Sequence, residues 1–317
     1  MLLISSPRFG EHTTPPGHPE RPERAEVFEQ VSDDWRDKDG RVVEPRPATR
    51  EELLRVHDAA HVDAIAATSG HAVMLDADTF TSPESYEIAL LAAGAAVQAM
   101  EHALDTGEIA FALVRPPGHH AERNKPMGFC LFNNIAVAAA AALARGLSRV
   151  AIVDIDVHHG NGTQWTFYDD PRVLYISTHQ FPFYPGTGTA DETGIGKGKG
   201  FTLNVPLAAG ATDADYAKAY AVIGERLHEY HPELLLVSAG YDAHTDDPLA
   251  SMRVSTAGYA AIVRSLAKTA AWIGCPMALV TEGGYDLAAL RACLDASLDV
   301  LAPASPKPQG GEGGGYN

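Results

Sequence analysis

Cysteine is scarce in this chain of 317 residues, and the three cysteines follow no pairing pattern. They are Cys130, Cys275 and Cys293. So sparse and odd a set argues against a disulfide framework and favours a reducing compartment. The first residues, MLLISSPRFG, also lack the basic start and the long apolar run of a signal peptide. We therefore expect a cytoplasmic protein.

Long apolar runs are equally absent. The richest stretch, AVAAAAALA (136–144), is far shorter than the about 20 residues that a membrane-spanning helix needs. It is more typical of a buried helix. We therefore expect no membrane partner.

Basic residues are few, because 24 Lys and Arg stand against 41 Asp and Glu and give a formal net charge of -17. A surface of this charge repels phosphate backbones, so we expect no nucleic-acid partner. It attracts cationic substrates instead. The chain is otherwise of ordinary globular composition, with 45% hydrophobic residues.

Short β-branched runs alternate with alanine-rich segments along the chain. We expect strands over 2–5, 110–114, 149–155, 172–178, 201–205, 233–240 and 276–284. We expect helices over 86–104, 133–146, 213–230 and 256–274. This alternation predicts an α/β fold with a mostly parallel sheet and helices on both of its faces.

Three segments fall outside the alternation. Residues 10–24 are rich in Pro and charge and should form a loop near the rim of the site. Residues 179–200 form a long Gly-rich loop, and such loops are usually functional or mobile. Residues 301–317 are of low complexity, which predicts a disordered tail behind one domain over 1–300.

Polar residues follow five of the seven expected strands. In a parallel α/β sheet, functional residues gather at the carboxyl ends of the strands. The segments at these ends are RPPGHHA (115–121), DIDVHHGNGT (154–163), STH (177–179), SAGYDAH (238–244) and TEGGY (281–285). Each one alone has a structural explanation, such as a solvated histidine pair or a turn. Their joint occurrence at strand ends indicates a functional site.

A metal site is the best explanation of the second segment. Alternate residues of a strand share a face, so Asp154, Asp156 and His158 should project together. Catalytic zinc usually takes three protein ligands, and Asp242 at another strand end is the candidate for the third. Two carboxylates would balance the charge of a divalent ion, so the site needs a separate general base and another electrophile. The pair His119 and His120 could supply the base, and Tyr285 the electrophile.

These segments resemble the motifs of the zinc-dependent histone deacetylases. The resemblance extends to GFCLFNN (128–134), STHQFPFYPGTG (177–188), NVPL (204–207), SAGYDAHTDDPL (238–249) and EGGYDL (282–287). It covers the chain to about residue 295 and is strongest to class II enzymes and to bacterial histone deacetylase-like and acetylpolyamine amidohydrolases. It implies a single-domain, arginase-like deacetylase fold that holds one Zn²⁺ per chain and structural K⁺ or Na⁺.

The resemblance also implies roles for individual residues. Zinc would be held by Asp156, His158 and Asp242. His120 would be the general base, and His119 an electrostatic group or proton donor. Tyr285 would bind the acetyl carbonyl oxygen.

Further residues would support this machinery. Asp154 would orient His119, and Asn161 would contact His120 where class I enzymes have Asp. Because an amide raises the basicity of its partner less than a carboxylate does, His120 should have the lower pKa of the two histidines. Asp154, Ser177 and Thr178 would hold potassium together with the backbone of Asp156 and His158.

Substrate-binding residues are implied in the same way. They are Gly128, Phe129, Tyr184, Leu249, Asp78 and Gly283. Phe129 and Tyr184 would flank a narrow tunnel for the lysine stem, although relatives usually have Phe at the position of Tyr184. Asp78 would bind the substrate backbone, and a helix-proximal cap is an equally good interpretation of this residue.

We therefore expect a zinc-dependent amidohydrolase that removes acetyl groups from the ε-amine of lysine in proteins or peptides. An acetylpolyamine deacetylase is the alternative, since the negative charge attracts polyamines. Leu249 argues against it, because a polyamine-selective relative has Glu there. A non-catalytic acyl-lysine binder would need a broken metal site or a missing tyrosine, and both are intact. A homo-oligomer is compatible with the sequence.

Overall fold

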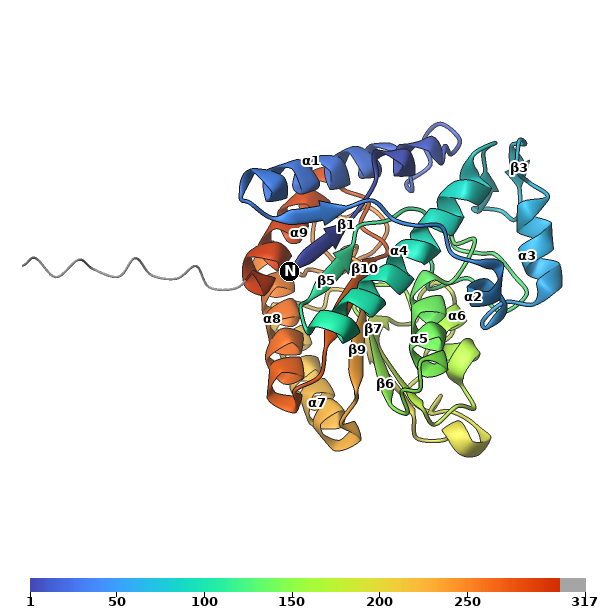
Figure 1. Cartoon of the computed structure of the whole chain (residues 1–317). Coiled ribbons are helices and arrows are strands. Elements are labelled where there is room, and N and C mark those ends of the chain that lie inside the picture. The colour runs from blue at the N-terminus through green and yellow to red at the C-terminus, as the bar shows by residue number, and fades with distance from the viewer. Residues whose placement is uncertain (303–317) are drawn as a thin grey trace, which may run out of the picture.

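The computed structural model describes residues 1–302, so residues 303–317 of the expected tail lie outside the described part. An eight-stranded, entirely parallel sheet forms its centre, in the order β2-β1-β5-β10-β9-β6-β7-β8 (Figure 1). The strands are β1 (Leu2–Ile4), β2 (Arg41–Val43), β5 (Ala110–Ala112), β6 (Val150–Asp154), β7 (Val173–Gln180), β8 (Thr202–Leu207), β9 (Leu234–Ala239) and β10 (Met277–Thr281). A small antiparallel pair, β3 (Val73–Met74) and β4 (Phe80–Thr81), lies apart from it.

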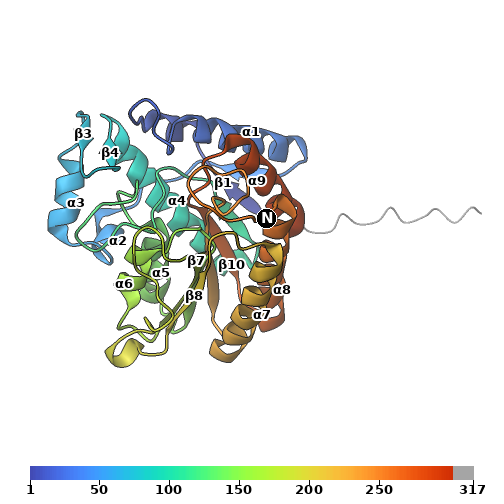
Figure 2. The same cartoon turned by 180° about the vertical axis from the view of Figure 1, so that it is seen from behind.

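Helices cover both faces of the sheet, as Figures 1 and 2 show from opposite sides. One face packs against α4 (Ser85–Thr106) and α5 (Asn134–Ala144), and α2 (Arg50–Leu54) and α3 (Ala59–Ala66) extend the same hydrophobic core beyond them. The other packs against α1 (Glu23–Asp37), α7 (Asp213–Tyr230), α8 (Thr256–Ile273) and α9 (Leu287–Leu301). A short helix, α6 (Asn161–Phe167), and the 3-10 turns η1 (Pro7–Glu11) and η2 (Gly196–Gly198) complete the described elements. The predicted α/β fold class is confirmed.

Both faces of the central strands are buried, which explains why those strands are apolar throughout. In β6, Val150 and Ile152 belong to one core, whereas Ala151 and Val153 belong to the other. The alternation follows from the two-residue period of a strand. A strand that contributes to two cores has no solvated face and needs no polar residues until it ends.

The register of the sheet brings the polar strand ends together. Asp154 is the last residue of β6 and pairs with Ser177 of β7 on one side and with Ser238 of β9 on the other. Because all eight strands run the same way, the segments after β5, β6, β9 and β10 leave the sheet at a single edge. Among residues 1–302, no helix is both long enough and apolar enough to span a membrane.

Candidate metal centre and active site

Three buried side chains converge after β6 and β9. Asp156, His158 and Asp242 each offer one ligand atom, and these atoms lie within 4.8 Å of one another. The His158 Nδ1 atom is 3.1 Å from an oxygen of Asp156 and 3.1 Å from an oxygen of Asp242. One imidazole nitrogen and two carboxylates form a donor set that suits a divalent transition metal.

The electrostatics of this cluster fit a cation. Burial, together with the charge of Asp156, raises the pKa of Asp242 to about 7. Burial disfavours the charged form of His158, but hydrogen bonds to Asp156 and Asp242 outweigh it and raise its pKa to about 10. Two carboxylates this close in a dry site require a positive charge between them, which a metal ion would provide.

Backbone groups orient the two carboxylates. The N–H of Val157 donates to Asp242 over 2.8 Å, and the N–H of Gly283 donates to Asp156 over 2.8 Å. A side chain at Gly283 would collide with Asp242, and one at Gly240 with Asp156. Glycine is therefore required at these two positions by the close approach of the ligands. Gly283 is not among the residues that line the tunnel, and its expected contact with a substrate stays a prediction.

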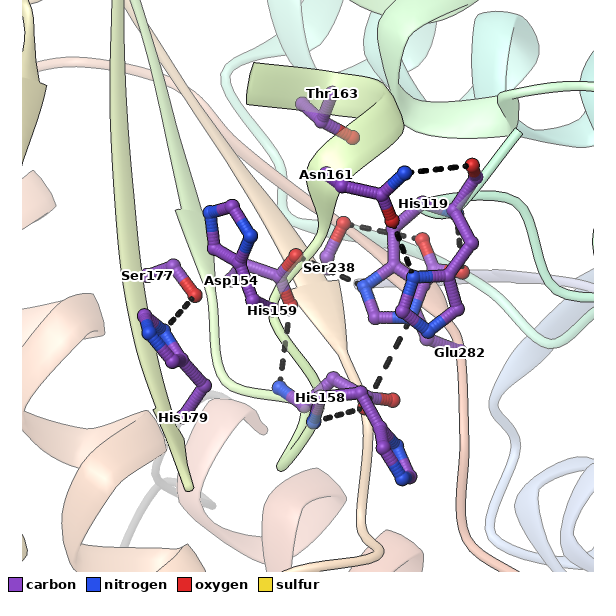
Figure 3. Close-up of polar contacts among 12 residues, drawn as sticks. His119, Asp154, His158, His159, Asn161, Thr163, Ser177, His179, Ser238 and Glu282 are labelled. Atoms are coloured by element: carbon purple, nitrogen blue, oxygen red, sulfur yellow. Dashed lines mark hydrogen bonds and ion pairs between the residues drawn. The ribbon is translucent and has the colours of Figure 1, made fainter. Parts of the chain in front are cut away.

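The tandem histidines lie beside the ligands with their rings 4.0 Å apart. His119 donates from Nδ1 to Asp154 over 2.9 Å (Figure 3). His120 donates from Nδ1 to Asn161 over 2.8 Å. Burial favours the neutral form of His119, but the charges of Asp154 and Asp156 outweigh it and raise its pKa well above 6.5. Burial and the neighbouring His119 lower the pKa of His120 well below 6.5. The expected order of the two pKa values is confirmed.

Sequence reasoning did not identify Glu282 as a site residue. This fully buried carboxylate follows β10 and accepts hydrogen bonds from the backbone of Gly118 and His119 and from the Ser238 hydroxyl. Figure 3 shows it beside the other polar groups at this sheet edge. Burial raises its pKa to about 7. It joins the ends of three strands and thereby fixes the loop that carries the tandem histidines.

A narrow pocket of about 170 Å³ leads to the cluster. Phe129 packs edge-on against Tyr285 with ring centroids 5.7 Å apart, and Tyr184 packs edge-on against His120 at 5.2 Å. Phe183, which sequence reasoning missed, stacks on His158 at 5.6 Å. The complete lining is Asp78, His120, Gly128, Phe129, His158, Phe183, Tyr184, Leu249 and Tyr285.

The tunnel wall includes a strained backbone. Phe129 has φ of 70°, a left-handed conformation that bulky residues rarely adopt. Gly128 before it has φ of 56°, and a side chain there would meet the ring of His120. Strain of this kind is found where the surrounding structure must place one side chain accurately. Here it turns the Phe129 ring into the tunnel.

The segment 10–24 reaches the rim, as predicted. His18 packs edge-on against Phe129 at 4.8 Å, and a groove of about 810 Å³ runs from this segment to Leu249 and Tyr285. Below the surface, Arg24 lies 5.1 Å from the Tyr285 ring and donates to the carbonyl oxygens of Glu282 and Gly284. The segment is therefore tied to the loop that carries Tyr285.

The residues predicted to hold potassium lie around Asp154. The Asp154 carboxylate is shared between His119 and the Tyr175 hydroxyl, while Thr178 is 3.5 Å from the Asp154 carbonyl. The Ser177 hydroxyl contacts His179 at 2.9 Å. This arrangement gathers hydroxyl and carbonyl oxygens at one point, and a bound monovalent ion stays a prediction.

Comparison with known proteins identifies the family. Residues 18–301 match the histone deacetylase domain. The chain is 40% identical over 291 residues to a probable deacetylase of Archaeoglobus fulgidus, covering 90% of this chain and 81% of that protein. It is 40% identical over 322 residues to a probable deacetylase of Methanothermobacter thermautotrophicus, covering 100% and 95%.

Plant proteins are similar as well. The chain is 41% identical over 300 residues to histone deacetylase 15 of Arabidopsis thaliana, which covers 92% of this chain but only 54% of that longer protein. The crystal structure of the HDA15 HD domain superimposes with a TM-score of 0.90 at 38% identity, over 95% of this chain and 90% of that one. Its likeness confirms the deacetylase-like fold. On these grounds the chain belongs to the histone deacetylase family.

Proposed function

We propose that the chain is a zinc-dependent amidohydrolase that removes acetyl groups from the ε-amine of lysine in proteins or peptides. The main support is the convergence of Asp156, His158 and Asp242 at the end of a tunnel that Tyr285 also lines. Zinc held by these ligands would supply a Lewis acid for the amide carbonyl and for a water molecule.

The chain's own residues would handle the protons. His120 has its Nδ1 proton bound to Asn161 and is kept neutral by burial, so its Nε2 can accept a proton from the attacking water. His119 is held protonated beside Asp154 and can give a proton to the leaving amine. Burial raises the pKa of Tyr285, so its hydroxyl stays neutral and donates to the carbonyl oxygen as negative charge develops there.

A peptide substrate suits the rim better than a free acetylpolyamine. The groove of about 810 Å³ shares Leu249 and Tyr285 with the tunnel and offers room for chain on either side of a lysine. A polyamine stem would occupy only the tunnel and would leave the groove empty. Leu249 at the lip is also apolar, which favours an alkyl stem over a second ammonium group.

Supporting ions form a smaller part of the proposal. A potassium or sodium ion would bind near Asp154, Ser177 and Thr178, with backbone oxygens of Asp156 and His158. Its role would be structural, since it would hold the segment between the zinc ligands.

The test compares an acetyl-lysine peptide with acetylputrescine, with and without a chelator. We expect turnover of the peptide at a higher kcat/KM, loss of turnover after chelation, and recovery on addition of Zn²⁺. Preference for acetylputrescine would instead establish the polyamine alternative. Tight peptide binding without any turnover at full zinc occupancy would identify a non-catalytic acyl-lysine binder.

A further inference from the structure

The amide of Asn161 has two chemically different ends, and only one of them suits His120. Its oxygen can accept from the His120 Nδ1–H, whereas its NH₂ group can only donate. The two orientations of the amide therefore select opposite tautomers of the imidazole. With oxygen toward His120, the proton lies on Nδ1 and Nε2 is free to accept another. With NH₂ toward His120, the proton must lie on Nε2.

Glu122 contacts the other end of this amide. The Asn161 Nδ2 atom donates to Glu122 Oε1 over 2.7 Å, and its oxygen accepts from His120 over 2.8 Å. Its remaining neighbours, the Met127 sulfur at 3.4 Å and the His120 carbonyl at 3.5 Å, are weaker acceptors. Asn161 itself is buried, with 2% of its surface exposed. A carboxylate accepts and never donates, so Glu122 permits only one orientation of the amide.

We propose that Glu122 is a positioning residue that sets the tautomer of His120 through the orientation of the Asn161 amide. This inference rests on the proposed function of His120 as general base. It explains why an asparagine can serve here: the amide is ambiguous by itself, and a second acceptor removes the ambiguity. A carboxylate at position 161 would need no such partner, because both of its oxygens accept.

Replacement of the Glu122 carboxylate by a hydrogen-bond donor tests the inference. In Glu122→Lys an ammonium group replaces the acceptor, so it should attract the Asn161 oxygen and turn NH₂ toward His120. We expect kcat to fall by about tenfold or more with little change in KM, since a general base contributes roughly 10²–10⁴-fold. Adding Asn161→Asp should restore most of the lost rate, because a carboxylate can accept from the lysine and from His120 together.

Milder variants and a control guard against a general loss of structure. Glu122→Gln can still present a carbonyl oxygen to Asn161, so it should lose less rate than Glu122→Ala. Glu225→Lys makes the same change of charge at an exposed position of α7 and should match the unsubstituted protein. Rates are compared per bound metal ion. A Glu122→Lys variant at the unsubstituted kcat, or a double variant no faster than Glu122→Lys, would overturn the inference.

The tautomer can also be observed without turnover. ¹⁵N NMR of histidine-labelled protein distinguishes a protonated Nδ1 from a protonated Nε2, and the His120 signal is assigned by its absence in His120→Ala. We expect Nδ1–H in the unsubstituted protein and Nε2–H in Glu122→Lys. The same tautomer in both would refute the inference. This readout stands even if the protein hydrolyses no acetyl-lysine, in which case only the proposed function fails.

Discussion

At the level of single residues, the site gives two chemically identical imidazoles different properties through their hydrogen-bond partners. His119 faces the carboxylate of Asp154, whereas His120 faces the amide of Asn161. Their pKa values move in opposite directions as a result, although burial lowers both. In the proposed mechanism, this difference would let one histidine give a proton and the other accept one.

Removal of either proposed reacting group should slow hydrolysis without releasing the metal. His120→Ala removes the base, and Tyr285→Phe removes the donor to the developing oxyanion, while neither residue belongs to the three-ligand cluster. We expect each to lose at least about tenfold in kcat, since such groups contribute roughly 10²–10⁴-fold. The measurement is kcat on an acetyl-lysine peptide together with zinc content. Full activity at equal zinc content would contradict the assigned roles.

Pattern alone located some of these residues and missed others. Asp156 and His158 were predicted from strand periodicity, but β6 ends at Asp154, so they converge in the segment after the strand rather than on its face. Asp242 was predicted because it follows a separate apolar strand. Phe183 lies in a loop without periodicity, so its stacking on His158 depends on a path that no local pattern encodes. Glu282 stood within a recognised motif, but only the three-dimensional register shows that it contacts Gly118, His119 and Ser238.

At the level of elements, the loop 181–200 is anchored in part by the carboxylate of Glu192. Glu192 accepts from Gln164 of α6 and from the backbone N–H of Gly188. The same loop carries Phe183 and Tyr184 into the tunnel wall. The absence of regular structure therefore does not mean that this wall is loosely held.

Loss of this anchor should weaken substrate binding more than chemistry. In Glu192→Ala the tunnel wall should be less ordered, while the histidines and the proposed metal ligands lie on other elements. We expect KM to rise by about fivefold, the equivalent of roughly 1 kcal/mol for one hydrogen bond, with a smaller change in kcat. Asp191→Ala, the exposed neighbour, is the matched control. Equal KM values for the two variants would argue against the anchor.

A second element-level feature is the attachment of the segment 122–133 to the turn between α2 and α3. His57 donates from Nδ1 to the Glu122 carbonyl, and its Nε2 accepts from the backbone N–H of Asn133, which caps α5. The second bond requires a neutral ring, because Nε2 can accept only when it carries no proton. Burial, reinforced by the neighbouring His61, lowers the pKa of His57 to about 3.

Folding stability should therefore decrease in acid through His57. The unfolded histidine titrates near 6.5 and the folded one near 3, so the full contribution is present above about pH 6.5 and is lost as pH falls toward 3. A single histidine with this difference in pKa lowers the free energy of unfolding by roughly 2 kcal/mol between pH 7 and pH 5. We expect denaturant unfolding in EDTA to show a shallower decline between pH 7 and 5 for His57→Gln than for the unsubstituted protein. An equal decline in stability for the two proteins would contradict the proposed contribution of His57.

The elements themselves were predictable where burial is uniform. All seven expected strands are present, and six of them contribute apolar side chains to both cores. The exception is β8, which includes the polar residues Thr202 and Asn204 and packs its partly buried apolar side chains against one core only. β2 was missed since its three residues are exposed or half-buried. α1 was also missed, because charged residues dominate it and only Val27, Phe28 and Val31 mark its buried face. In such a helix, the few apolar residues of the buried face do not stand out from the many charged residues around them.

At the level of the whole molecule, the alternation of strands and helices predicted the fold but not the strand order. β10, the last strand, lies between β5 and β9 in the middle of the sheet. Crossover helices of similar length would fit several other orders equally well. The central position matters for the proposed function, because it brings the Glu282 and Tyr285 segment between the histidine loop and the proposed ligand Asp242.

Net charge is the remaining whole-molecule property with a functional consequence. With 41 acidic and 24 basic residues, the protein should attract peptides that carry lysine or arginine beside the acetyl-lysine. Salt screens this attraction, since the Debye length falls from about 30 Å at 0.01 M to about 8 Å at 0.15 M. We expect KM for a basic peptide to rise several-fold over this range, whereas KM for a peptide with neutral flanks should change little. The comparison separates long-range attraction from contacts in the tunnel, because both peptides insert the same uncharged acetyl-lysine. An equal response of the two peptides would show that the negative surface plays no part in substrate choice, and specificity would then have to lie in the tunnel and its rim alone.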